Sequence, residues 1–173
     1  MEALEQGLAE TGVDRSRLDI LVTHIHTDHT GLSARVVSPG GKIYIGELDY
    51  PFTAQAFEDW FWVEMDKRFL KEGFPAEEVA VITQTNPARH LGPQLDISAY
   101  TPVKEGEVFT IGDYQLEVLS VPGHAPGQLC LWMEKEGILF TGDHVLFDIT
   151  PNISVWANMD NMLGQYLVLM IPV

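Results

Sequence analysis

The sequence is poor in cysteine and in positive charge, and it has no long apolar run. Its 173 residues contain a single cysteine, Cys130, which excludes an internal disulfide and favours a reducing compartment. The most apolar segment, YLVLMIPV, is far shorter than the roughly 20 residues that a membrane-spanning helix needs. The opening segment, MEALEQGLAE, lacks the basic and apolar regions of a secretory signal peptide. We therefore expect a cytoplasmic protein that does not interact with a membrane.

The scarcity of positive charge also restricts the partners. Ten Lys and Arg residues stand against 25 Asp and Glu residues, so the formal net charge is −15 with His neutral. Proteins that bind nucleic acid need a basic face for the phosphates, and anionic membrane surfaces attract basic clusters. We therefore expect a small-molecule substrate and no nucleic acid. Bound divalent cations would offset part of the negative charge.

The composition is otherwise that of a globular protein. Apolar residues make up 46% of the chain and charged residues 20%. A chain of this length can bury a sizeable core, so we expect one domain over residues 1–173. Cys130 lies in the apolar run QLCLWM and is expected to be a small core residue.

The spacing of the apolar residues predicts an α/β chain, with helices dominant in the middle and hairpin strands later. Strands are predicted over 18–23, 42–45, 107–111, 114–121, 128–134 and 138–141. Helices are predicted over 1–11, 32–37, 47–73 (as one or two helices), 75–82 and 158–170. The Pro- and Gly-containing segment 83–102 is predicted to be a loop.

The polar loop after the first predicted strand concentrates metal-binding side chains. Its candidate ligands are His24, His26, Asp28 and His29. Neutral imidazole and carboxylate groups are ligands that zinc accepts. In an extended segment, residues two apart point the same way, so His24 and His26 can share one ion. Asp28 and His29 lie where the chain turns into a helix, and they can face a second site.

Two later loops supply the partners that an incomplete site of this kind requires. His124 lies in the loop PGHAPGQ, and Asp143 lies in TGDH after another predicted strand. Either residue alone would more often be structural, but beside the first cluster both become candidate ligands. Thr23, Thr27 and Thr141 flank the ligands and either orient them or serve as caps and packing residues.

The segments THIHTDHTG, VPGHAPGQ and LFTGDHVLF, in this order, resemble the successive motifs of the metallo-beta-lactamase superfamily, most closely its glyoxalase II-like hydrolases. The resemblance spans roughly residues 18–149. It implies a four-layer αββα sandwich, with residues 47–102 as a mostly helical insertion. It also implies a binuclear site with two zinc ions, although iron or manganese occurs in some members. The first metal would be held by His24, His26 and His124, and the second by Asp28 and His29, with Asp143 as the bridge.

Two features depart from the family pattern. The acidic strand end of the family's opening hairpin is absent before Leu18, and no histidine follows His144 to complete the second site. We therefore expect an incomplete sandwich that lacks the first strands and most of the second half. The apolar tail is expected to be covered by a partner, or the chain to be truncated. Water, His90 or a neighbouring chain remain open as the missing ligand, and His90 alone is expected to be a surface residue.

The resemblance implies a hydrolase in which a metal-bound hydroxide attacks the carbonyl of an ester, thioester or lactone. Asp28 is the candidate catalytic residue, because its carboxylate can orient the hydroxide and assist proton transfer. An alternative is a truncated, catalytically impaired metal-binding fragment or interaction module, which the missing ligand and strands favour. A nuclease is a third alternative, and the negative charge disfavours it.

The aromatic run Trp60, Phe61 and Trp62 has two interpretations. It can roof the cleft and offer an apolar surface to the substrate. It can instead form the core of the helical insertion or a contact in a homodimer, and the sequence slightly favours this second interpretation. His144 adjoins Asp143 but is expected to face elsewhere.

Overall fold

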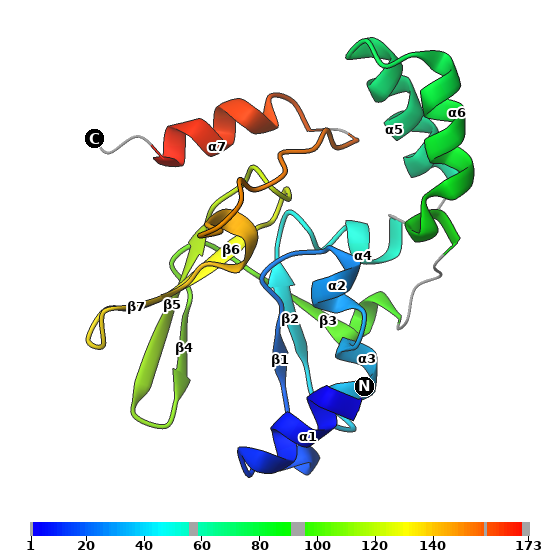
Figure 1. Ribbon diagram of the computed structural model, residues 1–173. Coiled ribbons are helices and arrows are strands. Elements are labelled where there is room, and N and C mark those ends of the chain that lie inside the picture. The colour runs from blue at the N-terminus through cyan, green and yellow to red at the C-terminus, as the bar shows by residue number, and fades with distance from the viewer. Residues whose placement is uncertain (1, 56–58, 91–95, 158, 171–173) are drawn as a thin grey trace.

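The computed structural model describes residues 2–55, 59–90, 96–157 and 159–170. Two sheets form its centre: a parallel sheet with the order β1-β2-β3 and an antiparallel sheet with the order β4-β5-β6-β7 (Figure 1). The strands are β1 (Ile20–Leu21), β2 (Ile43–Gly46), β3 (Tyr100–Val103), β4 (Val108–Ile111), β5 (Tyr114–Ser120), β6 (Leu129–Met133) and β7 (Ile138–Phe140). These elements confirm the α/β class.

The helices lie beside the parallel sheet, away from the antiparallel sheet, or beyond the ends of the strands (Figure 1). They are α1 (Glu2–Glu10), α2 (Thr27–Thr30), α3 (Ser33–Val36), α4 (Phe52–Gln55), α5 (Asp59–Lys71), α6 (Ala76–Thr85) and α7 (Met162–Met170). Short 3-10 turns are η1 (Arg15–Arg17), η2 (Pro87–His90), η3 (Ile97–Ala99) and η4 (Gly142–His144). In Figure 1 the hairpin of α5 and α6 and the helix α7 lie beyond one end of the strands, and α1 lies beyond the other.

The two sheets pack face to face through branched apolar side chains. Val103 of β3 clusters with Val118 of β5 and with Leu129 and Leu131 of β6. On the other face of the parallel sheet, Val22, Ile43 and Ile45 form a second cluster. Burial of these side chains supplies the main driving force for folding. Cys130 is also buried, as predicted from its apolar run.

A third cluster joins the helical insertion to the later part of the chain. Phe52 of α4 and Phe61 and Met65 of α5 pack with Trp156 and with Met162 of α7. The helix α7 begins at Met162 rather than near residue 158, because the Asn161 side chain accepts a hydrogen bond from Gly164 N at 3.0 Å and caps it. This cluster places α5 and the segment before α7 on the two sides of one apolar region.

The prediction of a loop over 83–102 is wrong at both ends. Helix α6 continues to Thr85, and Tyr100–Val103 forms the strand β3, which pairs in parallel with β2. Pro102 has no backbone N–H, so it suits only an edge strand, and β3 occupies the edge of its sheet. The strand exists because β2 lies beside it, and this tertiary contact has no signal in the local sequence. The helical insertion therefore ends before Tyr100.

The first predicted strand is also shorter than expected. Residues 18–23 contain only the two-residue strand β1, although Val22 N still donates to Tyr44 O of β2. Beyond Val22 the chain bends toward the antiparallel sheet, where Leu129 N donates to Thr23 O at 2.7 Å. This hydrogen bond joins the two sheets at the edge where the histidine-rich loop begins.

The core-facing side of the antiparallel sheet extends beyond the part that the parallel sheet covers. Ile111 and Phe140 lie on the same face as the buried Val118 and Leu131, yet both are exposed. This arrangement matches the incomplete sandwich expected from the motifs. In the described part of the chain, every helix is too short or too polar to cross a bilayer.

The difference in burial between two isoleucines predicts a clear contrast in stability. Ile43 is 0% exposed and Ile111 is 61% exposed. Ile43→Ala is expected to lower the free energy of unfolding by about 2–5 kcal/mol, because it leaves a cavity in the packed sheet. The matched change Ile111→Ala is expected to cost less than about 1 kcal/mol. Denaturant unfolding of both variants measures the difference, and equal losses would contradict this account of the core.

Candidate metal centre

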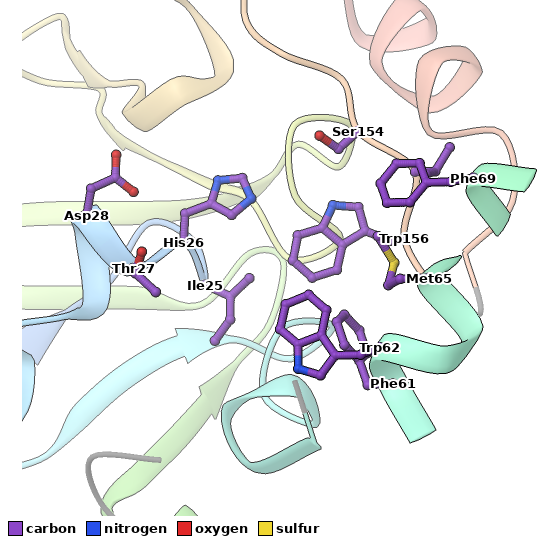
Figure 2. A pocket seen from close by; sticks show the side chains of 11 residues that line it. Ile25, His26, Thr27, Asp28, Phe61, Trp62, Met65, Phe69, Ser154 and Trp156 are labelled. Atoms are coloured by element: carbon purple, nitrogen blue, oxygen red, sulfur yellow. The ribbon is translucent and has the colours of Figure 1, made fainter. Parts of the chain in front are cut away.

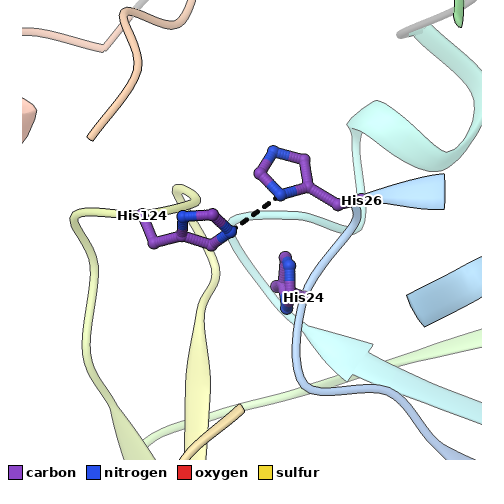
Figure 3. Close-up of side chains that lie close together, drawn as sticks. All are labelled: His24, His26 and His124. Carbon is purple, nitrogen blue, oxygen red and sulfur yellow. Dashed lines mark hydrogen bonds between the residues drawn. The ribbon is translucent and has the colours of Figure 1, made fainter. Parts of the chain in front are cut away.

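Three histidines from two distant loops converge at one edge of the sandwich. His24 follows β1, His26 precedes α2, and His124 lies in the loop before β6 (Figure 3). His26 Nδ1 and His124 Nε2 are 2.9 Å apart. One ring nitrogen from each of the three residues lies within 4.8 Å of the other two. This spacing suits nitrogen ligands that share one divalent ion.

Two of the remaining ring nitrogens have partners that orient the imidazoles. His24 Nδ1 lies 3.1 Å from Thr23 Oγ1, and His124 Nδ1 donates to the backbone oxygen of Asn152 at 2.6 Å. Metal-bound histidines usually engage their second nitrogen in this way. The two contacts leave Nε2 of His24 and Nε2 of His124 directed into the centre. Of the two roles that the sequence left open for Thr23, this contact corresponds to the orientation of a ligand.

The donor set fits a divalent cation. His24 Nε2 is buried and has no hydrogen-bond partner among the described residues, although buried polar atoms are rarely left in this state. Burial, reinforced by the neighbouring imidazoles, lowers the pKa of His24 to about 2. Burial and His124 lower the pKa of His26 to about 4. Both rings are thus neutral at physiological pH and offer lone pairs to a metal ion.

Asp143 lies between the three histidines and a second group. Its Oδ2 is 3.5 Å from His124 Nε2, and its Oδ1 is 3.3 Å from His29 Nε2. Ligand atoms of His24, His29 and Asp143 form the second set within 4.8 Å of one another. A carboxylate with one oxygen directed to each group has the position that a bridging ligand requires.

Asp28 lies at the exposed side of this arrangement. Its Oδ2 is 3.7 Å from His29 Nε2, and its side chain is 78% exposed. Asp28 belongs to neither of the two compact groups found among the described residues. The structure thus brings all six predicted residues into one region, with Asp28 at its rim.

The two remaining histidines have different positions. The His144 ring packs against Tyr166 of α7, with ring centroids 5.2 Å apart, so it faces away from the cluster as predicted. The side chain of His90 lies outside the described residues.

Sequence reasoning missed Asp49, which connects the two histidine loops. Asp49 is fully buried, and its carboxylate accepts hydrogen bonds from Ile25 N at 2.8 Å and from Gly127 N at 2.6 Å. Burial raises the pKa of Asp49 to about 7, although both backbone N–H groups oppose this shift. A Cβ atom at Gly127 would lie only 2.5 Å from Asp49 N, so this close approach requires glycine. The sequence signal that could have identified Asp49 was its position just after β2.

An apolar pocket adjoins the cluster and was only partly foreseen. It has a volume of about 290 Å³, and Phe61, Trp62, Met65 and Phe69 of α5 form one side of it (Figure 2). Ile25, His26, Thr27, Asp28, Ser154, Val155 and Trp156 complete the lining. The Trp156 ring stacks on the His26 ring, with centroids 5.7 Å apart. Phe61 and Trp62 therefore line a pocket beside the cluster, and Phe61 also belongs to the apolar core.

Comparisons with known proteins agree with this geometry. The family model described as the metallo-beta-lactamase superfamily matches residues 2–167. A solved metallo-beta-lactamase family protein from Thermus thermophilus is 30% identical, with a TM-score of 0.75 over 96% of this chain and 54% of that chain. These matches confirm the resemblance drawn from the three motifs and the fold that it implied.

Two curated relatives have named activities. The acyl-coenzyme A thioesterase MBLAC2 of Homo sapiens is 28% identical over 148 residues, which cover 84% of this chain and 47% of that protein. The hydroxyacylglutathione hydrolase GloC of Haemophilus influenzae is 31% identical over 133 residues, which cover 74% of this chain and 49% of that protein. The chain thus spans about half the length of these relatives.

The hydrogen bonds of Asp49 predict that its charge state and shape matter for stability. Asp49→Asn places an amide N–H₂ group opposite one of two backbone N–H donors and leaves that donor unpaired. In metal-free protein we expect the free energy of unfolding to fall by about 1–3 kcal/mol. Asp148→Asn, at an exposed position, is the control and is expected to change it by less than about 0.5 kcal/mol. Equal denaturant midpoints for the two variants would contradict the role of Asp49.

Because the buried Nε2 of His24 has no partner in the described part of the chain, a substitution of His24 is expected to abolish metal binding with little effect on the stability of the metal-free protein. His24→Leu removes a buried polar atom, so metal-free protein is expected to lose no more than about 1 kcal/mol. Zn²⁺ is expected to raise the melting temperature of the native sequence but not that of this variant. His144→Leu changes another buried histidine and is expected to keep the response to Zn²⁺. A normal Zn²⁺ response in His24→Leu would show that the cluster is not the metal site.

Proposed function

The chain belongs to the metallo-beta-lactamase superfamily, and from this membership and its site we propose that it is a metal-dependent hydrolase of acyl bonds. The substrate class is an ester, thioester or lactone of a small molecule. The observation that carries the proposal is the convergence of His24, His26 and His124 around the buried, unpartnered Nε2 of His24. A purely structural role would not explain why this nitrogen is kept without a partner.

Each candidate ligand has a role in the proposal. The first metal is assigned to Nε2 of His24, Nδ1 of His26 and Nε2 of His124. Thr23 and the carbonyl of Asn152 occupy the other ring nitrogens of His24 and His124, and the assigned nitrogens of His26 and His124 face each other at 2.9 Å. The second metal is assigned to His29 and Asp28, and Asp143 is the bridge between the two. Zinc is the expected ion for this set of imidazoles and carboxylates, with iron or manganese as alternatives.

When bound, the divalent ions would polarise a carbonyl oxygen and lower the pKa of water toward neutrality. The protein's own contribution is orientation and proton transfer. Asp28 is the acidic residue in the lining of the pocket. Its exposed carboxylate can orient the attacking water and accept its proton. Thr23 and the carbonyl of Asn152 keep the imidazoles of His24 and His124 in one orientation.

The surroundings of the site favour acyl bonds over phosphoryl bonds. The pocket beside His26 is lined by aromatic and aliphatic side chains and has no Lys or Arg in its lining. The chain as a whole carries a formal charge of −15, which disfavours nucleic acid as a substrate. Two relatives are named for acyl chemistry, one as a coenzyme A thioesterase and one as a hydroxyacylglutathione hydrolase. Together these features support an acyl substrate.

Metal removal and one ligand change test the proposal. Chelation is expected to abolish hydrolysis of a simple thioester, and added Zn²⁺ to restore it. Asp143→Asn is expected to reduce bound zinc from about two ions per chain and to lower kcat/KM by roughly 100-fold, because the bridging carboxylate is lost. Asp148→Asn is the control and is expected to retain both properties. Thioester hydrolysis that survives complete metal removal would overturn the proposed function.

A further inference from the structure

The apolar pocket is continuous with the candidate metal centre. His26 and Asp28 belong both to the predicted ligands and to the lining of the pocket. Trp156 lies against His26 and faces the pocket, as Figure 2 shows. Any group that occupies the pocket therefore lies next to the atoms assigned to chemistry.

The shape of the pocket follows from one helix face. Phe61, Met65 and Phe69 recur every four residues along α5, so they line a stretch of roughly 12 Å. The volume of about 290 Å³ is at the small end of the range for ligand sites. An apolar space of this length and small volume suits a single unbranched chain better than a broad ring system.

The wall of the pocket is held in place before any ligand arrives. The guanidinium group of Arg89 lies 4.8 Å from the centroid of the Trp62 ring and forms an ion pair with Asp66. This stacking and the ion pair fix the orientation of Trp62. Arg89 is paired with Asp66 and is not part of the lining, so it offers no free charge to a ligand.

We propose that this pocket binds the apolar chain of a medium-length acyl group, so that the chain determines which acyl compounds are hydrolysed. The proposal rests on the hydrolase function proposed above. The polar, charged half of a thioester has no cationic partner in the lining, whereas an alkyl chain gains free energy there by leaving water. With the chain in the pocket, the carbonyl lies at the end formed by His26 and Asp28.

A series of thioesters with one common thiol, N-acetylcysteamine, tests the preference. From acetyl to octanoyl, kcat/KM is expected to rise by up to about fourfold for each added methylene. Ser154→Phe introduces a ring into the pocket and is expected to lower the octanoyl-to-acetyl ratio of kcat/KM at least tenfold. Ser98→Phe, at an exposed position outside the pocket, is the matched control and is expected to keep the ratio.

Binding of a neutral alcohol gives a readout that does not depend on hydrolysis. In calorimetry, 1-octanol is expected to bind more tightly than 1-butanol, and Ser154→Phe is expected to weaken 1-octanol binding about tenfold or more. Trp62→Ala provides a second test from the opposite wall and is expected to weaken the same binding. Leu70→Ala, on the same helix but 47% exposed and outside the lining, is expected to have no effect on this affinity.

The outcomes separate the two proposals. Length-dependent hydrolysis and length-dependent alcohol binding, both reduced by Ser154→Phe, would support the acyl pocket. Hydrolysis that is indifferent to acyl length would overturn the pocket proposal and leave the hydrolase function intact. Octanol binding without any metal-dependent thioester hydrolysis would overturn the proposed function instead. Absence of octanol binding would refute the pocket proposal directly.

Discussion

The candidate metal centre depends on one buried carboxylate. Asp49 accepts N–H groups from Ile25 and Gly127, and so it fixes the loop of His24 and His26 against the loop of His124. These loops are about a hundred residues apart in the chain, and glycine at position 127 allows the close contact. The inter-sheet hydrogen bond from Leu129 to Thr23 acts at the same place. Without these connections the three imidazoles would have no common centre.

The electrostatics of the site follow from this enforced proximity. Burial and mutual repulsion keep His24 and His26 neutral, and the unpartnered Nε2 of His24 leaves a lone pair without a donor. A cation satisfies such a cluster better than any side chain of this acidic protein. The apolar pocket next to His26 has the opposite character, because its lining is aromatic and aliphatic. A polar centre beside an apolar space is the arrangement that an acyl substrate requires.

The parts of the structure with a local signature were predictable. Four closely spaced candidate ligands indicated the loop of His24. Alternating apolar residues predicted the hairpin strands β4 to β7. The strand β3 escaped prediction because Pro102 argues against a strand unless β2 is beside it. Asp49 was missed because its function lies in contacts with distant backbone groups, and the oxygen of Asn152 belongs to the backbone and carries no signal in residue type. Trp156 lies close to His26 only in the folded chain.

Anomalous X-ray scattering at the zinc edge, on crystals of zinc-loaded protein, tests the central claim most directly. We expect a peak about 2.0–2.1 Å from Nε2 of His24, Nδ1 of His26 and Nε2 of His124. A second peak is expected on the other side of Asp143. Zinc bound elsewhere in the molecule, with His26 and His124 still hydrogen-bonded to each other, would contradict that claim.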